Sequence, residues 1–80
     1  MTSPELRGVS ARELIRALEA DGFSWTRGRG SHRVYRHSDG RRVVLAFHRP
    51  SATFPPKTLA AILAGTGWTD DDLRRLQLIS

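Results

Sequence analysis

Residues Ser31–His48 read SHRVYRHSDGRRVVLAFH, and this stretch decides the fold. A Ser38-Asp39-Gly40 turn signal divides it into two runs, so we expect a β-hairpin with strands at Ser31–His37 and Arg42–His48. Phe23–Thr26 alternates apolar and polar residues and indicates one more strand before the hairpin. The three segments predict an antiparallel three-stranded meander. Alternate residues of a strand point to opposite faces. One face of the last strand therefore carries Val43, Leu45 and Phe47.

A helix precedes the meander and is predicted at Ala11–Asp21. Ser10 and Glu13 have the S-x-x-E spacing of a capping box, in which each side chain satisfies a backbone donor at the helix start. Gly22 supplies the left-handed residue that ends many helices. Phe23 follows it as the apolar residue that can fold back on the last turn.

Two helices are predicted after the meander. Arg49–Pro56 holds three prolines and is expected to be a connecting loop. A helix follows at Lys57–Ala64, and Gly65-Thr66-Gly67 is expected to end it. Thr69 and Asp72 have a capping spacing and predict a short last helix.

The predicted order is α-β-β-β-α with a short C-terminal helix, which makes an α+β fold. In such a fold, helices cover one face of a small antiparallel sheet. The 80 residues contain no repeat and no linker, so we expect one domain over residues 1–80. Val34 and Tyr35 are adjacent candidates for the buried face of the middle strand. These two residues alone therefore do not decide which face of the sheet carries His32.

The composition excludes several classes of protein. Cysteine is absent, which rules out disulfides, thiolate metal sites and a cysteine nucleophile. No apolar run is long enough for a transmembrane helix, and Met1–Glu5 lacks the basic-then-apolar pattern of a signal peptide. We therefore expect a cytoplasmic protein.

The positive charge is concentrated in one segment. Seven arginines and one aspartate give Arg27–Arg49 a charge of +6, whereas the whole chain carries +5. A basic segment of this kind attracts a polyanion such as nucleic acid. Arginine also suits forked hydrogen bonds to phosphate oxygens. The same charge fits a solvated surface, or a surface that binds an acidic partner protein.

Three histidines occur, and His32 is the first candidate for chemistry. It follows Arg29-Gly30-Ser31, and glycine lets a phosphodiester approach the backbone closely. A histidine can take and give a proton near neutral pH. RNA supplies its own nucleophile, the 2′-hydroxyl, so its cleavage needs a base, an acid and cations for the charge on phosphorus. The alternative is that His32 is an ordinary surface residue of the hairpin.

The other two histidines are less distinctive. His37 directly precedes the turn at Ser38 and is expected to be an exposed residue that flanks the turn. His48 ends the third strand. It is expected to bind phosphate, to complete an acid–base pair with His32, or to serve the structure.

The remaining candidates can bind phosphate or pack against other groups. Lys57 is a cation at the start of a helix, where phosphate binds readily. Trp25 and Trp68 are expected in the core, and Tyr35 is undecided between the core and base stacking. Asp70–Asp72 fits helix N-terminal charge better than a metal site, so no metal or other cofactor is expected. The predicted RNA- and phosphate-binding residues are Arg27, Arg29, Gly30, Ser31, Arg33, Arg36, His48 and Lys57.

Together these features resemble the HicA (YcfA-like) toxin family from Val9 to about Leu76. The central motif is Arg29-Gly30-Ser31-His32, a glycine-serine-histidine triplet after a basic residue. Around it lie, in order, Gly22-Phe23, Val34-Tyr35-Arg36-His37, Asp39-Gly40-Arg41, His48, Thr58-Leu59, Ile62-Leu63 and Gly65-Thr66-Gly67. The chain departs from the family at Ala46, where proline is frequent, and in residues 49–54, where lysine and glycine are usual.

The resemblance implies a fold like that of the double-stranded-RNA-binding domain. It also implies a type II toxin that cleaves mRNA independently of the ribosome, with His32 as the catalytic residue, and a HicB-type antitoxin that covers the active site. The expected mechanism is metal-independent transesterification, in which His32 is base, acid or both while Arg29 and Arg33 hold phosphate. The alternative is a non-catalytic module that binds double-stranded RNA through its shape and phosphates.

Overall fold

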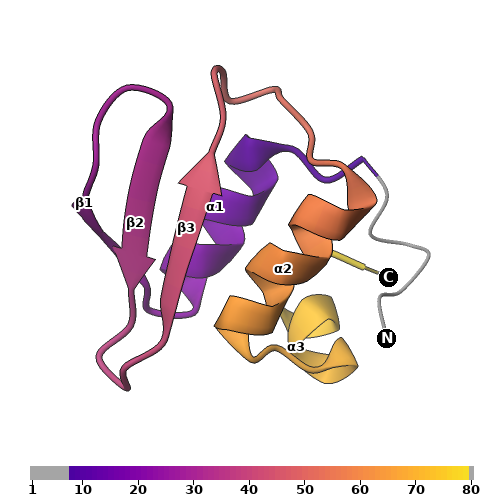
Figure 1. The fold of residues 1–80 in the computed structure, drawn as a ribbon. Coiled ribbons are helices and arrows are strands. Elements are labelled where there is room, and N and C mark those ends of the chain that lie inside the picture. The colour runs from indigo at the N-terminus through magenta and orange to yellow at the C-terminus, as the bar shows by residue number, and fades with distance from the viewer. Residues whose placement is uncertain (1–7, 80) are drawn as a thin grey trace.

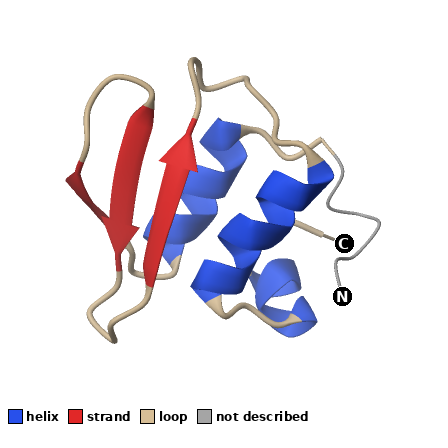
Figure 2. Cartoon of the chain, viewed as in Figure 1, coloured by secondary structure: helices blue, strands red, loops and turns tan. Residues whose placement is uncertain are grey.

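The computed structural model describes residues 8–79, which form helices and strands in the predicted order. The elements are α1 (Ala11–Ala20), β1 (Ser24–Arg27), β2 (His32–Arg36), β3 (Arg42–Ala46), α2 (Pro56–Thr66) and α3 (Asp70–Arg75). The strands lie together on one side of the molecule, and α2 and α3 lie on the other (Figure 2). The expectation for Met1–Glu5 concerns residues outside the described part.

The three strands form one antiparallel sheet in the order β1-β2-β3, which confirms the predicted meander. The register of β2 and β3 places His32 opposite Ala46. Tyr35 is fully buried, whereas His32 is exposed. Because neighbouring residues of a strand alternate between faces, His32, Val34 and Arg36 share the face opposite Tyr35. We call it the open face.

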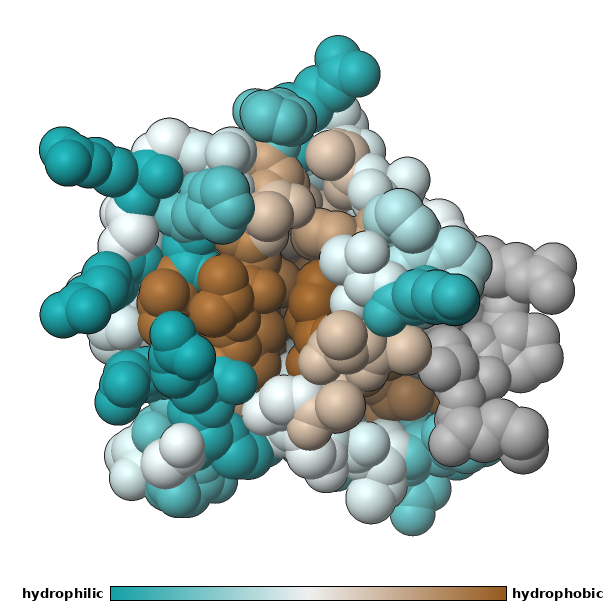
Figure 3. Space-filling model, in the orientation of Figure 1, coloured by the Kyte–Doolittle hydropathy of each residue, from teal (hydrophilic) through white to brown (hydrophobic). Residues whose placement is uncertain are grey.

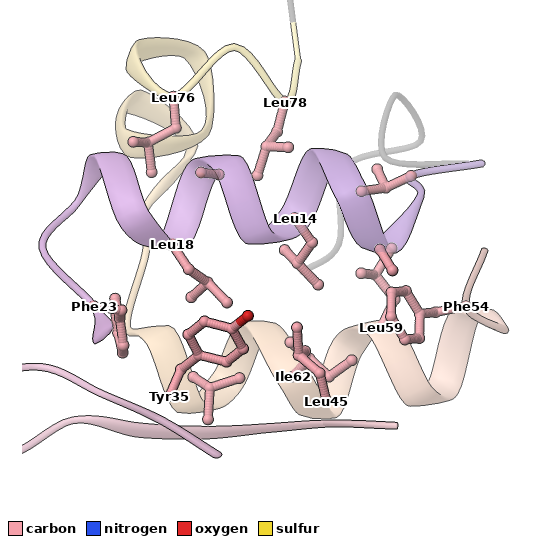
Figure 4. Packing of buried hydrophobic residues seen from close by; sticks show 14 of the residues in the cluster. Leu14, Leu18, Phe23, Tyr35, Leu45, Phe54, Leu59, Ile62, Leu76 and Leu78 are labelled. Atoms are coloured by element: carbon pink, nitrogen blue, oxygen red, sulfur yellow. The ribbon is translucent and has the colours of Figure 1, made fainter. Parts of the chain in front are cut away.

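The helices cover the other face of the sheet. α1 lies behind the sheet and α2 lies beside β3, so the described helices leave the open face uncovered (Figure 1). The core fills the space between the sheet and the helices, and the Tyr35 ring points from β2 toward Leu18 of α1 (Figure 4). Of the three residues predicted to share one face of β3, Val43 and Leu45 are buried and Phe47 is partly buried.

The predicted caps of α1 and α3 are confirmed. Ser10 and Glu13 form both hydrogen bonds of the capping box, and Thr69 forms the equivalent pair with Asp72. At the end of α1, the amide of Phe23 donates to the carbonyl of Leu18 at 2.9 Å, as a Schellman motif requires. Each strand and α1 differ from their predicted limits by one or two residues at an end.

Gly65-Thr66-Gly67 ends α2 as predicted, but the helix is longer than expected. It was expected to stop at Ala64, whereas it continues to Thr66, and Gly67 is the left-handed residue that ends it. Thr66 is fully buried, and its hydroxyl donates to the carbonyl of Leu63 at 2.7 Å. Gly65 packs closely on β3, since a Cβ there would lie 2.9 Å from the carbonyl oxygen of Arg42. Packing against β3 therefore favours helical conformation for these two further residues.

The carboxylate of Asp21 connects the end of α1 to three other segments. It accepts hydrogen bonds from Trp68 Nε1 at 2.8 Å, from Arg41 at 3.2 Å and from Arg75 at 3.0 Å. The same guanidinium nitrogen of Arg41 donates to the carbonyl of Thr66 at 2.6 Å. Burial alone raises the pKa of Asp21, but the hydrogen bonds from Trp68, Arg75 and Arg41 outweigh it and hold the pKa below 3.8.

His37 connects the same region to the hairpin turn and is not the exposed residue that the sequence predicted. Its Nε2 lies 2.8 Å from the carbonyl oxygen of Asp21, and its Nδ1 lies 3.1 Å from the amide nitrogen of Asp39. The ring also meets Phe23 edge-on, with 5.1 Å between centroids. Only 17% of the His37 side chain is exposed. The residue therefore serves the structure.

We predict that Asp21→Asn lowers the free energy of unfolding by about 1–3 kcal/mol at pH 7, because Arg41 and Arg75 each lose a charged acceptor and keep only the one on their own segment, Asp39 or Asp72. Ionised Asp21 stabilises the fold above the pKa of the unfolded chain, about 3.9. This stabilisation is lost as the pH falls through the lower pKa of the folded state. The advantage of the wild type over Asp21→Asn should therefore begin to decrease near pH 4 and should be smaller at pH 3 than at pH 7. Urea unfolding of both proteins at pH 7 and pH 3 measures this difference in the free energy of unfolding.

Asp71→Asn is the matched control. The Asp71 side chain is 95% exposed, and among residues 8–79 its carboxylate pairs with the neighbouring Arg74 of α3 alone, so this variant should unfold at nearly the wild-type urea concentration. Equal stability of the Asp21→Asn variant and the wild type at pH 7 would contradict the role assigned to Asp21.

Candidate nucleic-acid interface

The open face combines arginines with a small apolar surface. A depression of about 200 Å³ in it is lined by Thr26, Arg27, Val34, Arg36 and Arg42. In the space-filling view, hydrophobic residues gather in the middle of this face and hydrophilic side chains project around the sheet (Figure 3). This arrangement offers cations to phosphates and apolar surface to bases or sugars.

His32 lies at the end of the open face where the β1–β2 loop enters β2. Its amide donates to the carbonyl of Arg29 at 3.4 Å, which closes a turn through Gly30 and Ser31. Ser31 Oγ lies 3.4 Å from Nδ1 of His32. The imidazole is exposed and no hydrogen bond of the described residues occupies its Nε2. A ligand on the open face can therefore reach that nitrogen.

Two glycines shape this loop in different ways. Gly28 has φ +106°, and a Cβ there would overlap the carbonyl oxygen of His32 and lie 3.0 Å from Cα of Arg33. The loop can pack under the start of β2 only because residue 28 has no side chain. Gly30 also has positive φ, at +66°, but a Cβ there would meet nothing within 4 Å.

His48 follows β3 at the same end of the sheet. The amide of Phe47 donates to the carbonyl of Ser31 at 2.8 Å, which brings the backbone next to His48 alongside the glycine-serine turn. His48 is exposed. Two exposed histidines therefore flank the turn, His32 at one end of it and His48 across from it.

Arg33 does not lie with His32. It alternates to the other face of β2, where its guanidinium stacks between Trp25 and Phe47, 4.1 Å and 5.2 Å from the ring centroids. It also donates to the hydroxyl of Tyr35 at 3.4 Å. The structure thus separates two residues that the sequence placed together in one phosphate site.

The other predicted phosphate-binding residues are exposed, except Ser31, which is half-buried. Arg27 and Arg36 line the depression of the open face, and Arg29 lies in the turn before His32. Lys57 lies in the first turn of α2, which begins at the end of the molecule where β2 starts (Figure 1). The structure therefore brings the turn and the open-face arginines together on the sheet and places Lys57 beyond β3.

Two of the three aromatic residues considered lie in or against the core, and one is exposed. Trp68 packs against the core as predicted, and Tyr35 belongs to the core. The prediction for Trp25 was wrong, because 51% of this residue is exposed. Trp25 lies on the edge strand β1, past the region where the helices cover the sheet, and a period-2 pattern does not reveal where that cover ends.

Residues 8–79 contain no group of three or more histidine, aspartate or glutamate side chains placed to hold a metal ion. None of the helices described is both long enough and apolar enough to cross a membrane.

A family comparison gives a match, and a search of curated proteins does not. The family model that describes the HicA toxin of bacterial toxin–antitoxin systems matches residues 11–68. This range runs from the first residue of α1 to Trp68 and includes the whole sheet and α2. No curated protein matches the chain significantly.

We predict that Gly28→Ala destabilises the fold by about 2–3 kcal/mol, because the new Cβ combines a positive φ with an overlap on β2. Gly30→Ala is the matched variant, with positive φ but free space, and should cost about 1 kcal/mol. Thermal unfolding followed by circular dichroism measures both. If the two variants unfold at the same temperature, Gly28 does not support β2 at His32.

Proposed function

The chain belongs to the HicA toxin family of bacterial toxin–antitoxin systems, and from this membership and its geometry we propose that it is an endoribonuclease that cleaves mRNA. The observation that carries the proposal is the position of His32. It is an exposed histidine at a glycine turn, on the open face that arginines surround. We propose that the toxin acts in the cytoplasm, arrests translation by cutting messages, and needs no metal ion.

The first step of the proposed reaction is attack by the RNA itself. Nε2 of His32 takes the proton of the 2′-hydroxyl, whose oxygen then attacks the adjacent phosphorus. Ser31 Oγ supports this role when it accepts a hydrogen bond from Nδ1–H, because Nε2 then keeps its lone pair. The P–O bond to the 5′-oxygen breaks, leaving a 2′,3′-cyclic phosphate and a 5′-hydroxyl.

The leaving 5′-oxygen needs a proton, and two routes fit the site. His32 can return the proton that it has taken, or His48 can supply one from across the glycine-serine turn. The second route is supported because His48 is exposed and directly follows Phe47, whose amide is hydrogen-bonded to Ser31. An acid and a base on opposite sides of the turn would flank a phosphodiester that lies over Gly30.

Arginines supply the positive charge that the phosphates require. Arg29 lies in the turn itself, and Arg27 and Arg36 lie further along the open face. We assign Arg29 to the reacting phosphate and the open-face arginines to neighbouring phosphates. Arg33 lies on the opposite face, so in this proposal it acts elsewhere on the RNA.

The family implies an antitoxin partner, and the same surface suits one. We propose that a HicB-type antitoxin covers the open face, because a protein that blocks His32 and the depression lined by Arg36 and Arg42 prevents RNA binding. Its contacting surface should be acidic, since the face that it meets carries several arginines.

We predict that His32→Ala lowers the rate of cleavage of a single-stranded RNA by roughly 10²- to 10⁴-fold, because the general base is lost. The assay contains EDTA, and circular dichroism checks the folding of each variant. His48→Ala, measured beside it, should cause a loss of the same order if His48 is the acid. It should cause a smaller loss if His48 only binds phosphate.

Three results bear on the proposal. Cleavage by the wild type in EDTA with loss in folded His32→Ala supports it. Equal cleavage by the wild type and by His32→Ala contradicts the role of His32. Binding of RNA without cleavage by the wild type would favour the alternative, a non-catalytic RNA-binding module, which the arginine-lined depression also fits.

A further inference from the structure

Trp25 is a large aromatic residue on the surface of this protein. It lies in the middle of β1, at the free edge of the sheet, and 51% of it is exposed. It pairs with the buried Tyr35, so its side chain emerges on the helix-covered side of the sheet. Trp25 is not a core residue, and it has no role in the proposed active site.

Several contacts hold the indole in a fixed position. Its Nε1 donates to the carbonyl oxygen of Arg27 at 2.9 Å. The guanidinium of Arg33 covers the ring at 4.1 Å from its centroid. Arg33 is itself fixed by the Phe47 ring and by the hydroxyl of Tyr35. An aromatic ring that is ordered before binding loses little freedom when a flat ligand stacks on it.

The charged side chains in this part of the sequence are all positive. The guanidinium of Arg33 lies over the indole, and Arg27 and Arg29 lie at the end of β1 and in the adjoining loop. Residues 22–38 contain no aspartate or glutamate. An exposed aromatic ring among arginines is the combination that single-stranded nucleic acid uses, with bases on the ring and phosphates on the cations.

We propose that Trp25 is a stacking platform for an unpaired base of RNA, and the proposal rests on the proposed ribonuclease function for the identity of its ligand. The base stacks on the indole that Arg33 supports from beneath, and Arg27 or Arg29 binds an adjoining phosphate. The platform and the cleavage site then bind the same strand at different nucleotides.

The position of β1 lets one strand of RNA reach both sites. β1 is a single edge strand, with Arg27 lining the depression of the open face and Trp25 emerging on the other side. The β1–β2 loop runs from this edge to His32. An RNA strand that crosses the edge beside this loop meets the indole on one side of the sheet and the histidine on the other.

The test measures binding of an oligonucleotide that cannot be cut. A short 2′-O-methyl RNA lacks the free hydroxyl, and a second probe of equal length replaces its bases with abasic linkers. Trp25→Ala should weaken binding of the first probe by roughly 5- to 150-fold, the cost of one lost base–aromatic stack. It should leave binding of the abasic probe unchanged. Trp25→Phe keeps an aromatic ring and should retain most of the affinity.

Indole fluorescence gives a second readout that does not depend on Trp25→Ala being folded. The base-containing probe should quench the emission of the wild type more than that of Trp25→Phe, in which Trp68 alone emits. The abasic probe should quench neither. Cleavage of unmodified RNA by the wild type, followed in parallel, separates the two proposals: normal stacking without cleavage overturns the ribonuclease and leaves the platform standing.

Other results overturn the platform. Equal binding of the base-containing probe by the wild type and by Trp25→Ala excludes stacking. An equal loss of affinity for both probes means that Trp25 affects RNA binding only by positioning the neighbouring arginines. Normal RNA binding by Trp25→Ala with loss of antitoxin binding identifies Trp25 as an anchor for a protein partner instead.

Discussion

The carboxylate of Asp21 is the interaction on which the arrangement of this small fold depends. It joins the end of α1 to the hairpin through Arg41, to the segment between α2 and α3 through Trp68, and to α3 through Arg75. His37 adds a hydrogen bond from the hairpin to the backbone of the same residue. The sheet is thereby fixed against the helices, and the face that they leave uncovered is the one that carries the candidate site.

The burial of Tyr35 determines which residues of β2 lie on the open face. Because strand residues alternate, a tyrosine that points into the core places His32 and Arg36 on the open face and Arg33 on the other. A shift of one residue in the register would reverse all of these side chains. The glycine turn before β2 then sets the position of His32, since Gly28 packs where no side chain fits. The packing of Tyr35 in the core and the exposure of His32 therefore depend on the same strand register.

Local sequence signals were sufficient for the elements but not for the site. The capping boxes, the Gly22 stop and the hairpin turn depend on neighbouring residues, so they could be predicted. The face of His32 could not, because Val34 and Tyr35 are both suited to the core. The partners of Asp21 lie 20, 47 and 54 residues away and leave no periodic signal. Nor could the sequence show that Trp25 lies beyond the cover of the helices.

The structure thus gives a toxin-family chain an exposed histidine, a second histidine across a glycine turn, and arginines on the same side of the sheet. The proposed mechanism makes the 2′-hydroxyl of the RNA the nucleophile at this site. The most direct measurement uses one RNA with a single 2′-deoxy nucleotide on the 5′ side of a mapped cleavage point. This mechanism predicts that cleavage stops at that bond and continues at others. Unchanged cleavage at the deoxy position would contradict it, because the nucleophile would then be something other than the 2′-hydroxyl.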